Sequence, residues 1–189
     1  MSNPQLDIPD SHQSQALEGL KVLDFCWVAI GPMTTRYLAD HGATVVRIET
    51  PSRLDILRNA TPFKDDIPGV NRSGYFATMN SNKMAMTLNV KRPEGLEIVK
   101  KLVAWSDVVS ENFTPGTMEK LGLGFPELQA INPGIIMFST SMFGRGGPHS
   151  KQPGLGPVLT SLAGFTHLTG WPDRAPVSPY GAYTDFFLP

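Results

Sequence analysis

The 189-residue sequence contains one cysteine, Cys26, so it forms no internal disulfide and no cysteine-rich metal site. It lacks any run of about 18 apolar residues, the length needed for a membrane-spanning helix. Neither sign of charge is in excess, because 16 Lys and Arg oppose 17 Asp and Glu. This balance disfavours nucleic acid or an anionic membrane as the main partner. The low cysteine content favours a reducing, cytoplasmic location.

The short motifs of several enzyme classes are also missing. No G-x-G-x-x-G follows the first apolar segment and no P-loop is present, which disfavours a nicotinamide or ATP enzyme. No serine lies in a G-x-S-x-G turn, which disfavours a serine hydrolase. The four histidines have no second ligand at i+3 or i+4, so no metal site is expected. Cys26 precedes a bulky Trp27 and is expected to be a buried structural thiol.

The composition is that of a globular protein, with 41% apolar residues and many turn formers, 18 glycines and 17 prolines. Residues 1–16 are polar and lack the features of a signal peptide, and they are expected to be a disordered lead-in. Residues 183–189 end on an apolar run without a polar tail. We therefore expect residues 17–189 to be the N-terminal part of a larger domain.

Short apolar segments alternate with segments of helical spacing. This order predicts an α/β fold with a Rossmann-like layered sheet, mostly parallel. Residues 50–74 are expected to form a long loop with one short helix at 55–59. Ligands of such a sheet bind at the carboxyl ends of its strands. The expected strands are 21–28, 44–49, 84–90, 107–113 and 135–141, and the expected helices are 33–40, one starting at Pro93, 117–121, 125–131 and 158–165.

Several sequence blocks occur in a fixed order along the chain. They are Leu17–Phe25 with Gly31-Pro32, Leu38–Ala43, Val46–Glu49, Asn80–Lys83, Glu111–Gly116 with Leu121-Gly122, Phe143–Pro148 and Gly181–Asp185. Together they resemble the family III CoA-transferases (the CaiB/BaiF family, which includes formyl-CoA transferase). The resemblance implies the fold of that family, incomplete in this chain, and an interlocked dimer as the assembly of the full-length protein.

The resemblance also implies a role for Asp185. In that family an aspartate at this place attacks an acyl-CoA thioester, and an aspartyl anhydride and an aspartyl-CoA thioester follow. CoA is then part of the substrate, and no tightly bound cofactor is needed. An aspartate has an ordinary pKa of about 3.9 and is ionised at neutral pH. From bare sequence alone, the preferred interpretation of Asp185 is a helix N-cap behind Thr184.

The CoA site implied by the resemblance comprises Ala29, Lys91, Asn112, Phe113 and Lys120. Lysines can hold the CoA phosphates as point charges, and Arg53 is a weaker candidate for the same task. Tyr75 and Asn80 are candidates for the lining of the active site. Without the resemblance, the lysines read as solvated surface charges.

Two departures from the family pattern narrow the function. Ala29 stands where formyl-CoA transferase has glutamine, which disfavours formyl or oxalyl substrates. A related racemase uses a histidine in a G-H-D block, which here reads Gly154-Leu155-Gly156, and leucine cannot move a proton. His167 lies nearby and reads as a polar loop residue. An α-methylacyl-CoA racemase-like activity and a non-catalytic CoA-binding fragment or subunit remain as alternatives to CoA transfer.

Overall fold

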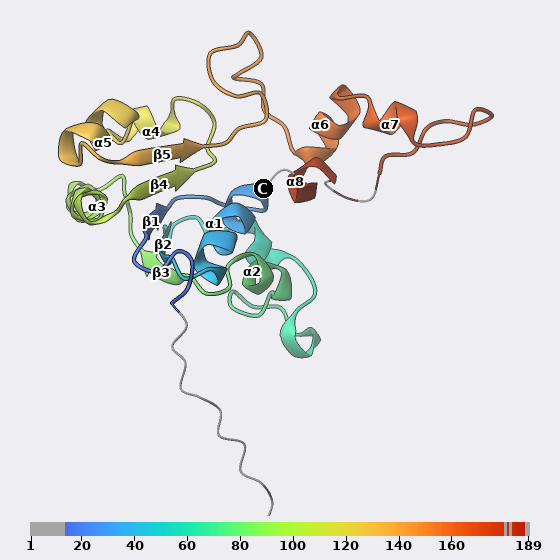
Figure 1. Cartoon of the computed structure of the whole chain (residues 1–189). Helices are drawn as coiled ribbons and strands as arrows, with labels where there is room; N and C mark the ends of the chain where they lie inside the picture. The colour runs from blue at the N-terminus through green and yellow to red at the C-terminus, as the bar shows by residue number, and fades with distance from the viewer. Residues whose placement is uncertain (1–13, 180, 182, 188–189) are drawn as a thin grey trace, which may run out of the picture.

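Five strands form one parallel sheet in the computed structural model, which describes residues 14–179, 181 and 183–187 (Figure 1). The order in space is β3-β2-β1-β4-β5, and every neighbouring pair runs parallel. This arrangement confirms the predicted Rossmann-like sheet. The strands are β1 (Lys21–Asp24), β2 (Thr44–Glu49), β3 (Met84–Thr87), β4 (Val108–Glu111) and β5 (Ile136–Ser139).

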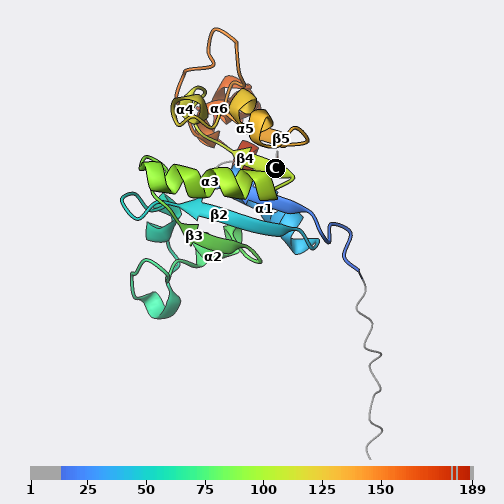
Figure 2. The ribbon, with the colours of Figure 1, turned by 90° about the vertical axis from the view of Figure 1, so that its left-hand side faces the viewer.

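Helices cover both faces of the sheet. The helix α1 (Ile30–Asp40) lies with α2 (Gly74–Met79) on one face, and α3 (Pro93–Trp105) lies on the other (Figure 2). Because side chains alternate along a strand, neighbouring residues of β1 serve different faces. Leu23 packs in the cluster that contains Val103 of α3, whereas Val22 packs in the cluster that contains Ala39 of α1. Both side chains are fully buried.

The remaining helical segments are short, and several begin at a proline. Pro93, Pro126 and Pro157 each lie in the first turn of a helix. Proline suits this position because the N–H groups of the first turn make no hydrogen bond within the helix. The segments are η1 (Ile56–Asn59), η2 (Lys64–Asp66), α4 (Thr117–Lys120), α5 (Phe125–Ile131), α6 (Gly156–Leu162), α7 (Phe165–Leu168) and α8 (Tyr183–Phe187). Helices α6 to α8 lie beyond the carboxyl ends of β4 and β5 (Figure 1).

The predicted strands are longer than the observed ones. The first was expected to reach Val28 but ends at Asp24, because the backbone then turns away from the sheet. The predicted helix at 158–165 is divided at Gly164, which has a φ of +84°. Helix α2 was not predicted. The predicted disordered lead-in falls mostly on residues 1–13, which lie outside the described residues.

A buried ion-pair network fixes the segment that follows β2. Glu49, the last residue of β2, accepts hydrogen bonds from Arg47 Nη1 at 2.8 Å and Arg58 Nη2 at 2.7 Å. Arg47 Nη2 also pairs with Asp55 at 2.7 Å, and Glu49 accepts the Asp55 N–H at 2.8 Å. All four side chains are buried. Two cations and two anions therefore compensate one another inside the protein, which buried charges require.

A second buried polar cluster lies at the end of β1. The Asp24 carboxylate accepts hydrogen bonds from Thr35 of α1 at 2.7 Å, Ser110 of β4 at 3.0 Å and Lys83 Nζ at 3.1 Å. Burial lowers the pKa of Lys83, and the charge of Asp24 opposes that effect. The cluster joins α1 and the segment before β3 to the central strand.

Among the helices that the structure describes, none is long and apolar enough to cross a membrane.

The Glu49 network predicts a pH-dependent stability. Burial alone would raise the pKa of Glu49, but Arg58, the Asp55 N–H and Arg47 outweigh it and lower the pKa to about 2. A carboxylate with a depressed pKa stabilises the fold above its ordinary pKa, 4.5, and this contribution is lost as the pH falls toward 2. Glu49→Gln should therefore lower the free energy of unfolding at pH 7 by about 3–5 kcal/mol. The free energy of unfolding of this variant should also depend less on pH between about 2 and 4.5 than that of the wild type. Urea unfolding at several pH values would measure both effects.

Glu97→Gln is the matched control for that prediction. Glu97 lies on the surface of α3 and pairs with Lys100 at 2.8 Å. This substitution should leave the unfolding midpoint nearly unchanged. Equal effects of the two substitutions would contradict the role assigned to the network.

Candidate active site

The backbone between β1 and α1 is held by side chains from three parts of the chain. The N–H of Cys26 donates to Asp24 at 2.9 Å, that of Trp27 to Asn112 at 2.8 Å and that of Val28 to Asp55 at 3.1 Å. Asn112 also donates to the Trp27 carbonyl at 2.6 Å. Three consecutive N–H groups that have left the sheet are therefore satisfied by fixed acceptors, as buried backbone donors require.

Val28 has a strained backbone conformation. Its φ is +69°, in the left-handed region that β-branched residues rarely adopt. The hydrogen bond to Asp55 joins this residue to the ion-pair network after β2. Strain of this kind persists only where the surrounding structure imposes it, and it is common at functional sites.

Two cavities meet at this loop. The smaller has a volume of about 340 Å³ and the larger about 580 Å³. Val28, Asn112 and Leu155 line both, so the cavities adjoin one another. The smaller is also lined by Ala29, Ile30, Thr140, Ser141, Met142, Gly154, Gly156, Leu159 and Asp185, and the larger by Trp27, Thr50, Ser52, Arg53, Asn89, Val90, Lys91, Phe113, Thr114, Thr117 and Leu121. Both cavities therefore lie at the carboxyl ends of the strands, where the sequence predicts a site.

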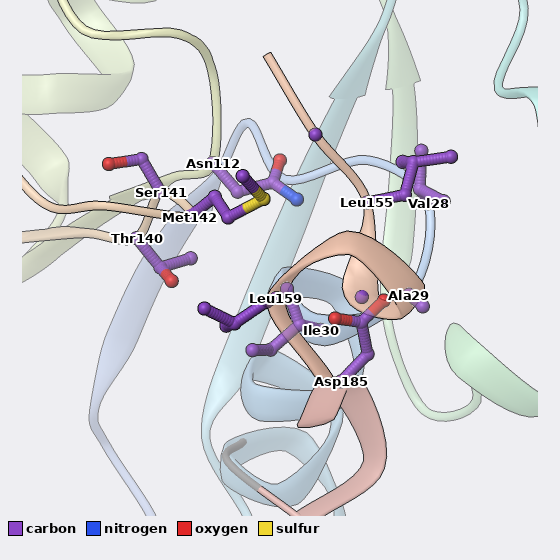
Figure 3. A pocket seen from close by; sticks show the side chains of 12 residues that line it. Val28, Ala29, Ile30, Asn112, Thr140, Ser141, Met142, Leu155, Leu159 and Asp185 are labelled. Carbon is purple, nitrogen blue, oxygen red and sulfur yellow. The ribbon is translucent and has the colours of Figure 1, made fainter. Parts of the chain in front are cut away.

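Asp185 lies in the smaller cavity. It is the third residue of α8, inside the helix, so the alternative interpretation as an N-cap is wrong. Its side chain is turned toward Ala29 at the start of α1 (Figure 3). Partial burial raises the pKa of Asp185, and a hydrogen bond from the Gly156 backbone acts in the opposite direction. The carboxylate is thus accessible from the cavity and more basic than one in water.

Tyr75 of α2 lies within electrostatic reach of Asp185. Burial raises the pKa of Tyr75, and the negative charge of Asp185 raises it further. The phenol therefore stays protonated and able to donate a hydrogen bond. Asn80 makes its contacts elsewhere, since it donates to the Phe76 carbonyl and accepts from Lys83.

The larger cavity combines cations with aromatic rings. Arg53 and Lys91 contribute positive charge. The guanidinium carbon of Arg53 lies 5.8 Å from the centre of the Trp27 ring, and Phe113 meets the same ring edge-on at 6.3 Å. Phosphate groups and a flat heterocycle are the chemistry that such a combination suits.

Four of the five residues predicted to bind CoA line the two cavities. Ala29 lines the smaller cavity, Lys91 and Phe113 line the larger, and Asn112 lines both. Lys120 is the last residue of α4, and the described lining of the two cavities does not include it. Its role in binding stays a prediction.

The structure also gives the positions of Cys26 and His167, which the sequence does not favour as catalytic residues. Cys26 is fully buried, and burial followed by the charge of Asp24 raises the pKa of its thiol, which confirms a structural cysteine. His167 lies on the short helix α7, so its interpretation as a loop residue is wrong. In the part of the chain that the structure describes, no three His, Cys, Asp or Glu side chains gather as a metal site would require.

Sequence reasoning did not identify Thr140 and Ser141 as residues of the smaller cavity. Thr140, Ser141 and Met142 follow β5 directly, so the rule that sites lie at strand ends indicated the correct edge of the sheet. The family resemblance includes instead the glycine-rich turn that follows them, Phe143–Pro148. That turn faces α4, because Arg145 pairs with Glu111 and Glu119, each at 2.6 Å.

Comparison with known proteins finds similarity to one family. A family model described as CoA-transferase family III matches residues 17–188. A succinyl-CoA:glutarate CoA-transferase of Mus musculus is 38% identical over 177 residues, which are 93% of this chain and 39% of that protein. A succinyl-CoA–L-malate CoA-transferase beta subunit of Chloroflexus aurantiacus is 37% identical over 166 residues, 86% of this chain and 39% of that protein.

Solved structures agree with this result. The crystal structure of a CaiB/BaiF family protein from Brucella suis superimposes with a TM-score of 0.84 at 37% identity. The match covers 92% of this chain and 46% of that one. The chain therefore spans less than half the length of the relatives it matches.

The raised pKa of Asp185 predicts that its charge lowers stability. A carboxylate whose folded pKa exceeds its ordinary value destabilises the fold once it is ionised. Asp185→Asn should therefore raise the free energy of unfolding at pH 7 by about 0.5–1 kcal/mol, a value that allows for solvent screening. The gain should disappear as the pH falls through the Asp185 pKa, which thermal unfolding at several pH values would measure.

Asp173→Asn is the control, because Asp173 is exposed and Arg174 lowers its pKa. It should give no gain in stability. A destabilised Asp185→Asn variant at neutral pH would contradict the raised pKa.

Proposed function

The chain belongs to CoA-transferase family III, and from this we propose that the protein transfers CoA from an acyl-CoA donor to a carboxylic acid acceptor, with Asp185 as the nucleophile. The observation that carries the proposal is the position of the Asp185 carboxylate. It lies in a small cavity that adjoins a larger one bearing Arg53 and Lys91. One cavity suits a reacting acyl group, and the other suits the charged body of CoA.

The proposed reaction has four steps at one carboxylate. Asp185 attacks the donor thioester carbonyl, the carbon–sulfur bond breaks, and CoA thiolate leaves a mixed anhydride behind. The thiolate then attacks the aspartyl carbonyl, which releases the donor acid and forms an aspartyl-CoA thioester. The acceptor carboxylate displaces CoA from this thioester and forms a second anhydride. Finally, the thiolate attacks the acceptor carbonyl, and Asp185 is restored as a carboxylate.

The surroundings of Asp185 suit these steps. Partial burial makes the carboxylate more basic, and a more basic carboxylate is a better nucleophile while it remains ionised. Apolar side chains around it, among them Ile30 and Leu159, limit the access of water to an anhydride. The Tyr75 hydroxyl is a candidate donor to the oxyanion that forms during each attack.

We place CoA in the larger cavity by the same reasoning. Its phosphates would meet Arg53 and Lys91, and its adenine would lie near Trp27 and Phe113. The pantetheine arm would then pass Asn112, which the two cavities share, to bring the thioester to Asp185. Positioning of this kind supplies much of the rate of a group transfer.

The full-length protein is proposed to act with a second subunit, as the resemblance implies. Large apolar side chains are exposed between α6 and α8, with Leu168 78% and Trp171 70% accessible. Exposed apolar surface of this kind commonly marks a contact with another chain or another part of the same chain.

A trapping experiment tests the proposed nucleophile. When the protein carrying this sequence is incubated with an acyl-CoA and hydroxylamine, Asp185 should be converted to a hydroxamate, because both acylated forms react with this amine. Mass spectrometry of the peptide containing Asp185 would detect it. Asp185→Ala should lose at least about 1,000-fold in turnover and form no adduct, while still binding CoA. Asp173→Ala should retain activity, since Asp173 is exposed.

Two results would point to a different function. Exchange of the α-proton of an acyl-CoA without CoA transfer would favour the racemase-like alternative. CoA binding by a fully folded protein with neither activity would favour a non-catalytic CoA-binding subunit.

The proposed place of CoA yields a separate prediction. Lys91→Gln should weaken CoA binding about 5- to 10-fold, and the loss should shrink at high salt, because a cation on phosphate is partly screened. Isothermal titration at two salt concentrations would measure this. Lys101→Gln, on the exposed side of α3, should leave the affinity unchanged. Unchanged affinity in the Lys91 variant would place the phosphates elsewhere.

A further inference from the structure

One backbone residue, Gly156, contacts both Asp185 and the residue before it. The Gly156 carbonyl accepts hydrogen bonds from the hydroxyls of Thr160 at 2.9 Å and Thr184 at 3.1 Å. The two hydroxyls lie 3.4 Å apart, and both threonines are buried. This hydroxyl pair therefore joins α6 to α8 at a point adjacent to the proposed nucleophile.

The other side of Gly156 faces the Asp185 carboxylate. The Gly156 backbone lowers the pKa of Asp185, against the effect of burial. A Cβ atom at position 156 would lie 2.6 Å from the carboxyl carbon of Asp185, closer than any real contact. The carboxylate thus rests directly on the Gly156 backbone, and no other residue type leaves room for it.

Helix α8 cannot hold Asp185 in place by itself. It has five residues, Tyr183–Phe187, and a helix of that length is unstable without tertiary contacts. The orientation of Asp185 must therefore come from what α8 packs against. Helix α6 supplies those contacts through Gly156 and Thr160.

We propose that Thr184 and Thr160 are positioning residues that hold Asp185 against Gly156 in the geometry required for attack on the thioester. This inference rests on the proposed function of Asp185, and it adds residues that do not touch the substrate. The hydroxyls act through the Gly156 carbonyl, which fixes the distance between α6 and α8. Misplacement of a reacting group by about 1 Å can reduce the rate on the order of 100-fold.

Thr184→Val tests the role of the hydroxyl, because valine keeps the shape and loses the donor. We expect kcat for CoA transfer to fall about 10- to 100-fold, while KM for the acyl-CoA and the Kd for CoA stay within about twofold. The rate of hydroxamate formation at Asp185 should fall in parallel with kcat. Thr184→Ser, which restores the donor, should recover most of the activity.

Ser161→Ala is the matched control. Ser161 lies on the same helix, is exposed and donates to the Pro157 carbonyl at 3.0 Å. Its loss removes a hydroxyl from α6 without touching Gly156, so kcat should not change. The Kd for CoA and the thermal unfolding midpoint report whether each variant is folded.

Gly156→Ala provides a second, steric test. It shows whether the position of Asp185 against Gly156 matters for the reaction if Thr184→Val does not fold. The added methyl group displaces the carboxylate, while both threonine hydroxyls remain. We expect a kcat loss at least as large as that of Thr184→Val, with CoA affinity retained. The inference is wrong if folded Thr184→Val or folded Gly156→Ala keeps wild-type kcat. That outcome differs from a failure of the proposed function, in which Asp185→Ala itself would remain active.

Discussion

The site depends on how the chain leaves the central strand. The N–H of Phe25 still donates to the Ser110 carbonyl of β4, but the next three backbone N–H groups have no partner in the sheet, and each must find another acceptor. Asp24, Asn112 and Asp55 supply those acceptors from the ends of three different segments. The turn at Val28 that results is strained, yet it is held, and it forms the wall between the two cavities.

This constraint ties the chemistry of the site to the charged interior of the fold. Asp55 accepts the Val28 N–H and also pairs with Arg47, and Arg47 is in turn shared with Glu49. A change deep in that network would therefore move a cavity wall without touching the substrate. Another part of the lining of the smaller cavity is built differently. There, short helices beyond the sheet bring Asp185 to the cavity through contacts between backbone and hydroxyl groups.

Much of the fold follows from the sequence, because apolar strands, prolines at helix starts and the order of elements are local signals. The ends of the strands do not, since β1 stops where distant side chains capture its backbone. Asp185 was identified only through family resemblance, because a lone aspartate after a threonine has the pattern of a helix cap. Thr160 and Gly156 could not be linked to it at all. Their relation to Asp185 exists only once α6 and α8 pack together.

Transfer of oxygen tests the central claim most directly. In the proposed sequence of steps, the acceptor carboxylate becomes joined to the Asp185 carbonyl through one of its own oxygens, and that oxygen stays with Asp185 when the acceptor leaves as a thioester. After turnover with an acceptor acid labelled with ¹⁸O in its carboxylate, the Asp185 peptide should contain ¹⁸O by mass spectrometry. Turnover that leaves the Asp185 carboxylate unlabelled would contradict covalent transfer through this residue.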